Sequence, residues 1–258
     1  MKITALTENT SAHSRFGCEH GLSLYIETAK HKILFDMGQS DLFSENAALL
    51  GIDLRKVDIA VVSHGHYDHT GGLKKFLEIN DTAPVYISRH AFGSHFNGTE
   101  KYIGMDPSLQ GHPRLRETGN VYCIDDELCL YTCNDKNRAY NIESGGLNRK
   151  ENGILVPDDF RHEQYLLITE DHKDVLISGC SHKGIMNISQ WFRPSVIVGG
   201  FHFSKLPLDD KLKEYATLLR STGTDFYTCH CTGQEQFEYM KKYMDNLYYL
   251  STAQTIEL

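Results

Sequence analysis

The residues best suited to chemistry form a short cluster of histidines around one aspartate. Residues 63–69 read Ser-His-Gly-His-Tyr-Asp-His, and the candidate metal ligands among them are His64, His66, Asp68 and His69. Imidazole and carboxylate groups are the ligands that a divalent metal of borderline softness prefers. Four of them on one short loop are too crowded to close around one ion, and burying them without partners would be costly. We therefore predict that they divide between two ions about 3.5–4 Å apart.

The elements around this cluster indicate a layered α/β fold. An apolar run at 57–63 predicts a buried strand that ends at the cluster, and Leu73, Phe76 and Leu77 predict a helix after it. Strands that end in histidine-bearing loops occur again downstream, so we expect two mixed β-sheets packed face to face with helices outside, in one domain over 1–258. The other predicted strands are 22–29, 31–36, 165–169, 174–179, 195–199 and 225–229, and the other predicted helices are 41–50, 212–219 and 237–244.

The stretch 90–162 interrupts this pattern. It is rich in glycine, asparagine and charged residues and has few apolar periods, so we expect it to lack regular structure and to form a lid-like insertion over the metals. It carries Arg138 and Arg149, whose guanidinium groups would suit a phosphate-bearing substrate. The alternative is that these side chains lie in solvent, far from the metals.

Composition excludes several classes of protein. The formal net charge of −8 argues against non-specific nucleic-acid binding, and no apolar run approaches the roughly 20 residues of a membrane span. Seven cysteines are an odd number without framework spacing, which predicts free thiols in a reducing compartment. With no secretory signal at the N-terminus, we expect a cytoplasmic protein with a small-molecule substrate and leave its oligomeric state open.

The histidine cluster resembles the H-x-H-x-D-H signature of the metallo-β-lactamase superfamily. The segment Leu34-Phe35-Asp36-Met37-Gly38 resembles the upstream aspartate motif of the same superfamily. Within it, the chain is similar to the branch named for dihydropterin–ribofuranosylaminobenzene phosphate synthase. The supporting segments cover most of the chain and are 19–23, 179–185, 199–202 and 230–233. The resemblance implies an αββα metallo-β-lactamase sandwich with two bound divalent ions, zinc above all, and manganese or iron as the other candidates.

The resemblance also implies a division of the ligands. It assigns His64 and His66 to the first ion and Asp68, His69 and His230 to the second. We predict that His182 completes the first site. The alternative is His162, because Cys180 stands where many superfamily members carry a bridging aspartate. Asp36 is expected to orient a ligand by a hydrogen bond rather than to bind metal.

The catalytic residues implied by the resemblance are Asp68 and His202. Asp68 would hold the second ion and accept a proton from water, and His202 would contact substrate or donate a proton. His20 has a similar, weaker case. Cys229 and Cys231 flank His230 and are interpreted as small buried residues. Ordinary structural roles are expected for His13, His31, His90, His95, His112 and His172.

These residues favour a metal-dependent hydrolase that attacks an unspecified, possibly phosphorylated small molecule with a metal-bound hydroxide. The alternative is a synthase-like transferase that releases pyrophosphate. Its branch carries a Thr-Gly-Glu-Ile-Pro-Arg-like stretch, of which residues 131–138 keep only the threonine. Two other classes fit less well. An iron redox protein of this fold would need a flavin domain, for which 258 residues leave no room. A non-enzymatic binding protein would be expected to have lost metal ligands, whereas the four in the first motif are all present.

Overall fold

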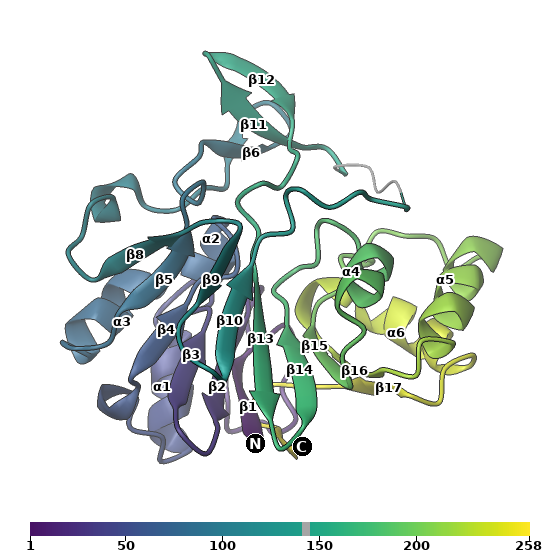
Figure 1. The fold of residues 1–258 in the computed structure, drawn as a ribbon, viewed down its shortest axis with the longest axis horizontal. Helices are drawn as coiled ribbons and strands as arrows, with labels where there is room; N and C mark the ends of the chain where they lie inside the picture. The colour runs from purple at the N-terminus through teal and green to yellow at the C-terminus, as the bar shows by residue number, and fades with distance from the viewer. Residues whose placement is uncertain (141–144) are drawn as a thin grey trace.

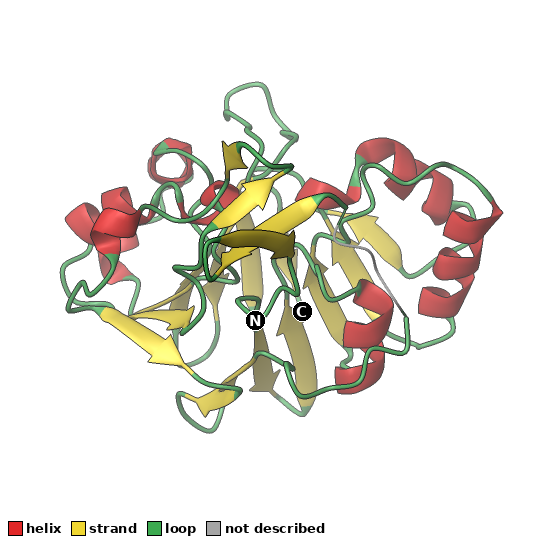
Figure 2. Cartoon of the chain, turned by 90° about the horizontal axis from the view of Figure 1, so that it is seen from above, coloured by secondary structure: helices red, strands yellow, loops and turns green. Residues whose placement is uncertain are grey.

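The computed structural model describes residues 1–140 and 145–258. Two seven-stranded β-sheets pack face to face, with helices on the outer face of each sheet (Figure 1). Seen from above, the strands occupy the middle of the molecule and the helices flank them on both sides (Figure 2). The predicted αββα sandwich of mixed sheets is confirmed.

The first sheet contains the N-terminal strands. Its strands in spatial order are β18 (Thr255–Glu257), β1 (Lys2–Thr7), β2 (Ser23–Glu27), β3 (Lys32–Phe35), β4 (Ile59–Val61), β5 (Val85–Ser88) and β8 (Leu115–Thr118). Pairing is antiparallel from β18 to β3 and parallel from β3 to β8. The parallel strands therefore end at a common edge.

The second sheet repeats this arrangement. Its strands in spatial order are β17 (Leu247–Tyr249), β16 (Asp225–Thr228), β15 (Val196–Gly199), β14 (Lys173–Ile177), β13 (Tyr165–Glu170), β10 (Leu128–Tyr131) and β9 (Val121–Cys123). Pairing is parallel from β17 to β14 and antiparallel from β14 to β9. The start of β13 consequently lies at the same edge as the end of β14.

The helices cover the outer faces and complete the core. Helices α1 (Leu42–Leu49) and α3 (Leu73–Ile79) pack on the first sheet, and α4 (Ile185–Phe192), α5 (Asp210–Arg220) and α6 (Gln234–Lys241) pack on the second. The short elements are α2 (Tyr67–Thr70), η1 (Leu54–Lys56), η2 (Pro107–Leu109) and η3 (His230–Thr232). Alternation along the strands divides the apolar side chains, because Ile33 and Phe35 face the other sheet while Leu34 faces the helices.

The prediction that 90–162 lacks regular structure is wrong. Strand β8 joins the first sheet, and β9 and β10 join the second. A separate four-stranded antiparallel sheet contains β12 (Ile154–Pro157), β11 (Leu147–Glu151), β6 (His95–Asn97) and β7 (Lys101–Tyr102). It stands above the ends of the sandwich strands in Figure 1. Its strands have only two to five residues each, too few to show the apolar periodicity on which the prediction depended. Residues 141–144 of this stretch lie outside the described residues.

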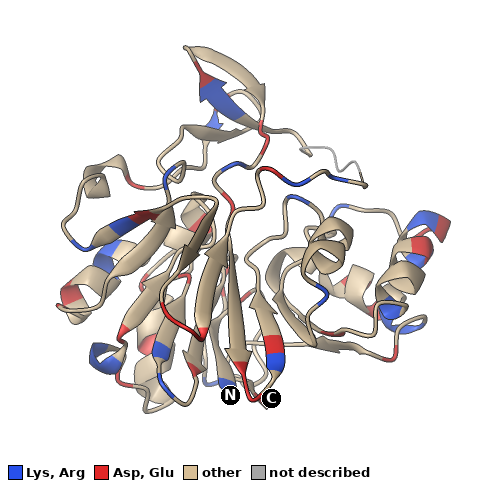
Figure 3. Cartoon of the chain, in the orientation of Figure 1, with Lys and Arg blue, Asp and Glu red and all other residues tan. Residues whose placement is uncertain are grey.

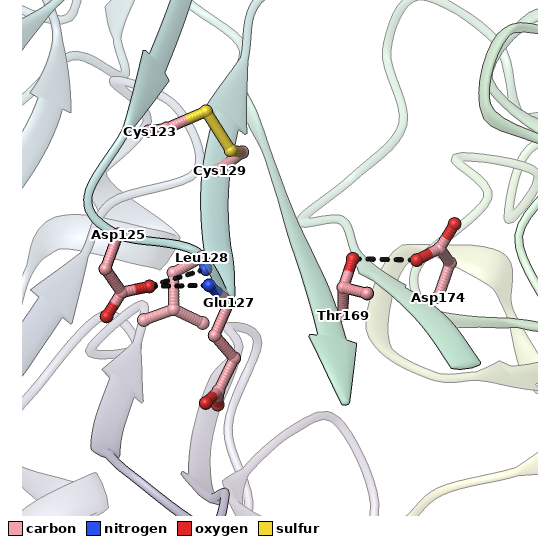
Figure 4. The surroundings of a disulfide bond; sticks show 7 residues. All are labelled: Cys123, Asp125, Glu127, Leu128, Cys129, Thr169 and Asp174. Atoms are coloured by element: carbon pink, nitrogen blue, oxygen red, sulfur yellow. Dashed lines mark hydrogen bonds between the residues drawn. A yellow bond between two sulfur atoms is a disulfide. The ribbon is translucent and has the colours of Figure 1, made fainter. Parts of the chain in front are cut away.

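The prediction of free thiols is wrong for two of the seven cysteines. Cys123 and Cys129 form a disulfide across the hairpin of β9 and β10 (Figure 4). In the turn between them, Asp125 accepts hydrogen bonds from the amides of Glu127 and Leu128 at 2.8 and 2.9 Å. The turn brings the two cysteines opposite one another, a pairing that their spacing alone did not reveal.

Charged side chains of both signs are mixed over the outer helices and loops (Figure 3). None of the helices in the described part of the chain combines the length and apolar character needed to cross a membrane.

Candidate metal centre

The candidate ligands meet at the edge where the strands of the two sheets end. Asp36 follows β3, the 63–69 segment follows β4, Cys180 and His182 follow β14, and η3 begins with His230 after β16. Four residues at these strand ends have left-handed backbones, with φ of 56° at Asp36, 56° at Ser181, 57° at His202 and 49° at His230. Strained backbone of this kind is kept where the surroundings hold it in place, and it clusters at functional sites.

One set of ligand atoms comes from His64, His66 and His182. All three imidazoles are buried, and a nitrogen of each lies within 4.8 Å of a nitrogen of the others. The Nε2 atoms of His64 and His182 are 3.3 Å apart. Two nitrogens bound at 2.0–2.1 Å to one tetrahedral zinc ion would be separated by about 3.3 Å. The separation therefore fits two ligands of a single ion.

A second set comes from Asp68, His69, Cys180 and His230, which are also buried. His69 Nε2 is 3.2 Å from Cys180 Sγ and 3.6 Å from Asp68 Oδ2, and His230 Nε2 is 3.3 Å from the same oxygen. These separations fit the edges of a second coordination shell. Sequence reasoning noted the position of Cys180 but did not count its thiol among the ligands.

Hydrogen bonds to Asp36 fix the tautomers of two ligands. Ser63 Oγ donates to Asp36 Oδ2 at 2.6 Å, so its oxygen is left to accept the Nδ1 proton of His64 at 2.8 Å. His69 Nδ1 donates to the same carboxylate oxygen at 2.7 Å. His64 therefore carries its proton on Nδ1 and directs its Nε2 lone pair at the site, and His69 directs its Nε2 atom there. The predicted orienting role of Asp36 is consistent with this geometry.

Residues after β1 hold His230 in the same way. The side-chain oxygen of Asn9 accepts from His230 Nδ1 at 2.7 Å, and Glu8 accepts from the His230 amide at 3.0 Å. The side-chain nitrogen Nδ2 of Asn9 donates to His20 Nδ1 at 3.3 Å, so the proton of neutral His20 lies on Nε2. That nitrogen is 3.4 Å from Asp68 Oδ2. The Nε2 proton of His20 thus lies on the side of the ring nearest the Asp68 carboxylate. Neither Glu8 nor Asn9 carried a signal in the sequence.

The choice between His182 and His162 also depends on tautomers. The Gly65 amide donates to His162 Nδ1 at 2.9 Å, so neutral His162 keeps its proton on Nε2. That nitrogen then has no lone pair for a metal. His182 has no such constraint, and its Nδ1 atom has no hydrogen-bond partner among the described residues. The arrangement favours His182 over His162 as the third ligand of the first ion.

Two buried charged residues support the loop of His182. The Glu163 carboxylate accepts from the amides of His182 and Lys183 at 2.6 and 3.0 Å. The Lys183 ammonium group donates to the carbonyls of Thr132 and Glu163 at 2.8 and 2.9 Å. Burial lowers the pKa of Lys183 to about 8. These residues tie the start of β13 to the end of β14, a contact that sequence reasoning missed.

The protonation states match a metal site. Burial, reinforced by neighbouring histidines, holds the pKa values of His64, His66 and His182 well below the ordinary value. Burial also lowers the pKa of His230 to about 4. These imidazoles are neutral at pH 7, as ligation requires. Burial alone would lower the pKa of His69, but the Asp36 and Asp68 carboxylates raise it to about 9, so an ion must displace a proton there.

The ligands open into a cavity of about 220 Å³ that is also lined by Lys101, His202 and Lys205. The His202 ring lies 4.4 Å from the His182 ring, and burial lowers the pKa of His202 to about 4. Residues Asn97, Lys101 and Leu147 of the four-stranded sheet form one wall of this cavity. Movement of that wall as a lid stays a prediction.

The expectation that Arg138 and Arg149 face the metals is wrong. Neither is among the described residues that line this cavity. Arg149 lines a different cavity and pairs with Glu151 at 3.0 Å and Asp159 at 3.3 Å. Arg138 donates to the Asp159 carbonyl at 2.6 Å. Acidic neighbours pair with Arg149 and a local carbonyl engages Arg138, contacts that their positions in the sequence did not reveal.

Comparisons with known proteins agree with the geometry. The family model of the metallo-beta-lactamase superfamily matches residues 16–218. An uncharacterized protein of Methanocaldococcus jannaschii is 30% identical over 241 residues, 90% of each chain. The 7,8-dihydropterin-6-methyl-4-(beta-D-ribofuranosyl)-aminobenzene-5'-phosphate synthase of the same organism is 29% identical over 259 residues, 90% of this chain and 88% of that protein. The crystal structure of Tm1679, named a metal-dependent hydrolase of the beta-lactamase superfamily, has a TM-score of 0.85 at 29% identity and covers 100% of this chain and 99% of that chain.

The metal-free protein should lose stability as the pH falls from about 6.5 to 4. Histidine in an unfolded chain has a pKa of about 6.5, whereas burial lowers the pKa values of His162 and His230 to about 4. The unfolded chain therefore binds more protons in this window, and each such histidine lowers the free energy of unfolding by up to about 1.4 kcal/mol per pH unit.

Urea unfolding of chelator-treated protein at a series of pH values measures this effect. His69 has the opposite sign, because its raised pKa contributes stability below pH 6.5 that is lost as the pH rises towards 9. A His230→Asn variant should show a shallower fall below pH 6.5 than the parent protein. Equal slopes in the two proteins would contradict the assignment of His230 as a buried neutral imidazole.

Proposed function

The chain belongs to the metallo-β-lactamase superfamily, and on that premise we propose that it is a metal-dependent hydrolase of a phosphorylated small molecule. The observation that carries the proposal is the convergence of seven ligand-type side chains in two sets, with the Nε2 atoms of His64, His69 and His230 directed inwards. We propose two divalent ions, with zinc favoured by the imidazole, carboxylate and thiol donors. His64, His66 and His182 would hold the first ion, and Asp68, His69, Cys180 and His230 the second.

Bound divalent ions lower the pKa of water towards neutrality and polarise a phosphoryl or carbonyl oxygen. The chain itself supplies proton acceptors and orientation. Burial alone would raise the pKa of Asp68, but His69 lowers it well below its usual range, so the carboxylate is ionised. Asp68 would accept a proton from the attacking water, and His20, whose Nε2 atom lies 3.4 Å from Asp68 Oδ2, would orient the carboxylate. Neutral His202 on the cavity wall would bind the substrate beside His182.

Two lysines support a phosphorylated substrate. Lys101 and Lys205 line the cavity of the metal ligands, in a chain whose formal net charge is −8. The Lys101 ammonium group lies 5.4 Å from the centre of the Tyr67 ring, a cation–π contact that holds it at the cavity. Ammonium groups bind phosphate as point charges and raise the local concentration of anionic substrates.

A synthase-like transferase that releases pyrophosphate is the second candidate. The named synthase of Methanocaldococcus jannaschii, 29% identical over 90% of this chain, supports it. Residues 131–138 differ from the stretch expected in that branch, and Arg138 is engaged by the Asp159 carbonyl. The hydrolase therefore remains our first proposal.

Purified protein should contain close to two divalent ions per chain by elemental analysis. A His66→Ala variant should lose the first ion, because it removes one of three ligands. An Asp68→Ala variant should mainly weaken the second. The control is His13→Ala, which changes an exposed histidine away from the site and should leave the metal content unchanged. Parent protein without stoichiometric metal would refute the proposal.

A panel of phosphoesters, thioesters and lactones tests the substrate class. Phosphoesters should be hydrolysed with the highest kcat/KM, and Lys101→Ala or Lys205→Ala should raise their KM about three- to tenfold, an effect of about 0.7–1.4 kcal/mol. Metal content and the KM of uncharged substrates should not change. The matched control is Lys74→Ala, on the exposed side of α3. Equal KM changes for charged and uncharged substrates would argue against phosphate recognition by these lysines.

The same panel separates the two candidate functions. A hydrolase should turn over a phosphoester in water without a second organic substrate. A transferase should release pyrophosphate only when a pterin diphosphate and a ribosyl-aminobenzene phosphate are both present. Release that requires both compounds would replace the first proposal with the second.

A further inference from the structure

A second buried cluster lies against the ligand His66 and contains His95, Asp158 and His162. Their side chains are almost fully buried, with exposures of 2%, 5% and 0%. His95 begins β6, Asp158 follows β12, and His162 precedes β13. The cluster therefore joins the four-stranded sheet to the sandwich. None of these three residues is among the described residues that line the cavity of the metal ligands.

Hydrogen bonds fix the donors and acceptors in this cluster. His95 Nδ1 donates to Asp158 Oδ2 at 2.7 Å, so the His95 lone pair is on Nε2. The Gly65 amide donates to His162 Nδ1 at 2.9 Å, which leaves the His162 proton on Nε2, 3.5 Å from the same carboxylate oxygen. Asp158 thus faces one N–H group from each histidine. Burial alone would raise its pKa, but the two histidines lower it well below the usual range, and the carboxylate is ionised.

Three buried nitrogens in and beside this cluster have no hydrogen-bond partner among the described residues. They are Nε2 of His66, His95 and His162, and the ring centres of His66 and His95 are 5.5 Å apart. His95 Nε2 carries a lone pair. A neutral His66 that ligates through Nδ1 carries its proton on Nε2, and a ligating histidine usually donates its other N–H group. With His66 bound to the metal through Nδ1, its Nε2 would be a donor and His95 Nε2 an acceptor.

The cluster also has the composition of a third metal site, since His66, His95, Asp158 and His162 each offer an atom within 4.8 Å of the others. Its hydrogen bonds disfavour that use. His162 Nδ1 is occupied by the Gly65 amide, so its Nε2 keeps a proton, and Asp158 Oδ2 already faces two N–H groups. A third ion would have to break these bonds. A hydrogen-bonded chain that ends at His66 keeps the Gly65–His162 and His95–Asp158 bonds intact.

We propose that Asp158, His95 and His162 form a positioning triad that holds the 64–66 loop at two points. His162 anchors the backbone at Gly65, and His95 accepts from the His66 imidazole, with Asp158 orienting both histidines. The triad would set the affinity of the first metal site and couple it to the placement of the four-stranded sheet, since His95 and Asp158 belong to that sheet's strands or follow them. The inference rests on the proposed metal site and is independent of the substrate.

The first test reads the tautomers directly in metal-free protein labelled with ¹⁵N-histidine. Two-bond ¹H–¹⁵N correlation spectra distinguish the two neutral forms of imidazole. We expect His162 with its proton on Nε2 and His95 with its proton on Nδ1. His162 with its proton on Nδ1, or two tautomers in equal exchange for either ring, would overturn the triad. This test requires no substitution in the triad and no bound metal.

The second test measures zinc affinity by competition with a chromogenic chelator. Asp158→Asn and His95→Gln should weaken the first ion by about 10- to 100-fold, the usual effect of removing a partner of a ligating histidine. The second ion should bind as in the parent protein. The matched control is Asp159→Asn, whose carboxylate faces Arg161 rather than the triad and should leave both affinities unchanged. Unchanged first-site affinity in folded Asp158→Asn and His95→Gln would refute the proposal.

The remaining outcomes separate this inference from the proposed function. Three ions in the parent protein and two in His95→Gln would show a third metal site in place of the triad.

A His162→Asn variant keeps an acceptor near the Gly65 amide and should retain more zinc affinity than His162→Ala. Equal loss of affinity in the two variants would contradict the Gly65 anchor. If the parent protein binds no metal, the proposed function fails, while the tautomers of His95 and His162 still decide whether the hydrogen-bonded chain exists.

Discussion

The carboxylate of Asp36 is the contact on which the metal centre depends. It is fully buried and accepts from the Ser63 amide at 2.7 Å, from the Ser63 hydroxyl at 2.6 Å and from His69 Nδ1 at 2.7 Å. These bonds join the end of β3 to the end of β4 and direct the Nε2 atoms of His64 and His69 at the site. Hydrogen bonds to a buried carboxylate are stronger than neutral ones, and losing one leaves a charged group unsatisfied.

The β-sandwich brings these strand ends together. Parallel strands β3 and β4 in one sheet and β14 to β16 in the other end at the same edge, where the loops approach within hydrogen-bond distance. The loops at this edge approach so closely that no side chain fits at Gly65 or Gly179. A Cβ atom at Gly65 would collide with the Ala91 carbonyl, and one at Gly179 would collide with the Ser63 hydroxyl. Close packing of the loops thus excludes water from the ligands and leaves the cavity beside Lys101 and His202 as the open side.

The four-stranded sheet connects the 90–162 stretch both to the cavity and to the cluster around His66. Its residues form a wall of the cavity, and its ends supply His95 and Asp158 to a buried cluster behind His66. The four-stranded sheet therefore contacts the cavity on one side and the cluster around His66 on the other. The guanidinium groups of Arg138 and Arg149 likewise contact Asp159 within this region rather than lining the cavity.

The sequence by itself determined the fold class and the centre of the site. Alternating apolar strands and amphipathic helices specify layers because their periods decide which face is buried, and the 63–69 motif places its ligand types together by covalent proximity. The tertiary structure alone decided which distant groups complete the site. Asn9 and Glu163 are far in sequence from His230 and His182, to which they hydrogen-bond, and their side-chain types are common in loops. Likewise, His162 and His182 are indistinguishable as sequence letters. Only the amide that donates to His162 decides which nitrogen keeps its proton, because that contact exists only once the chain has folded.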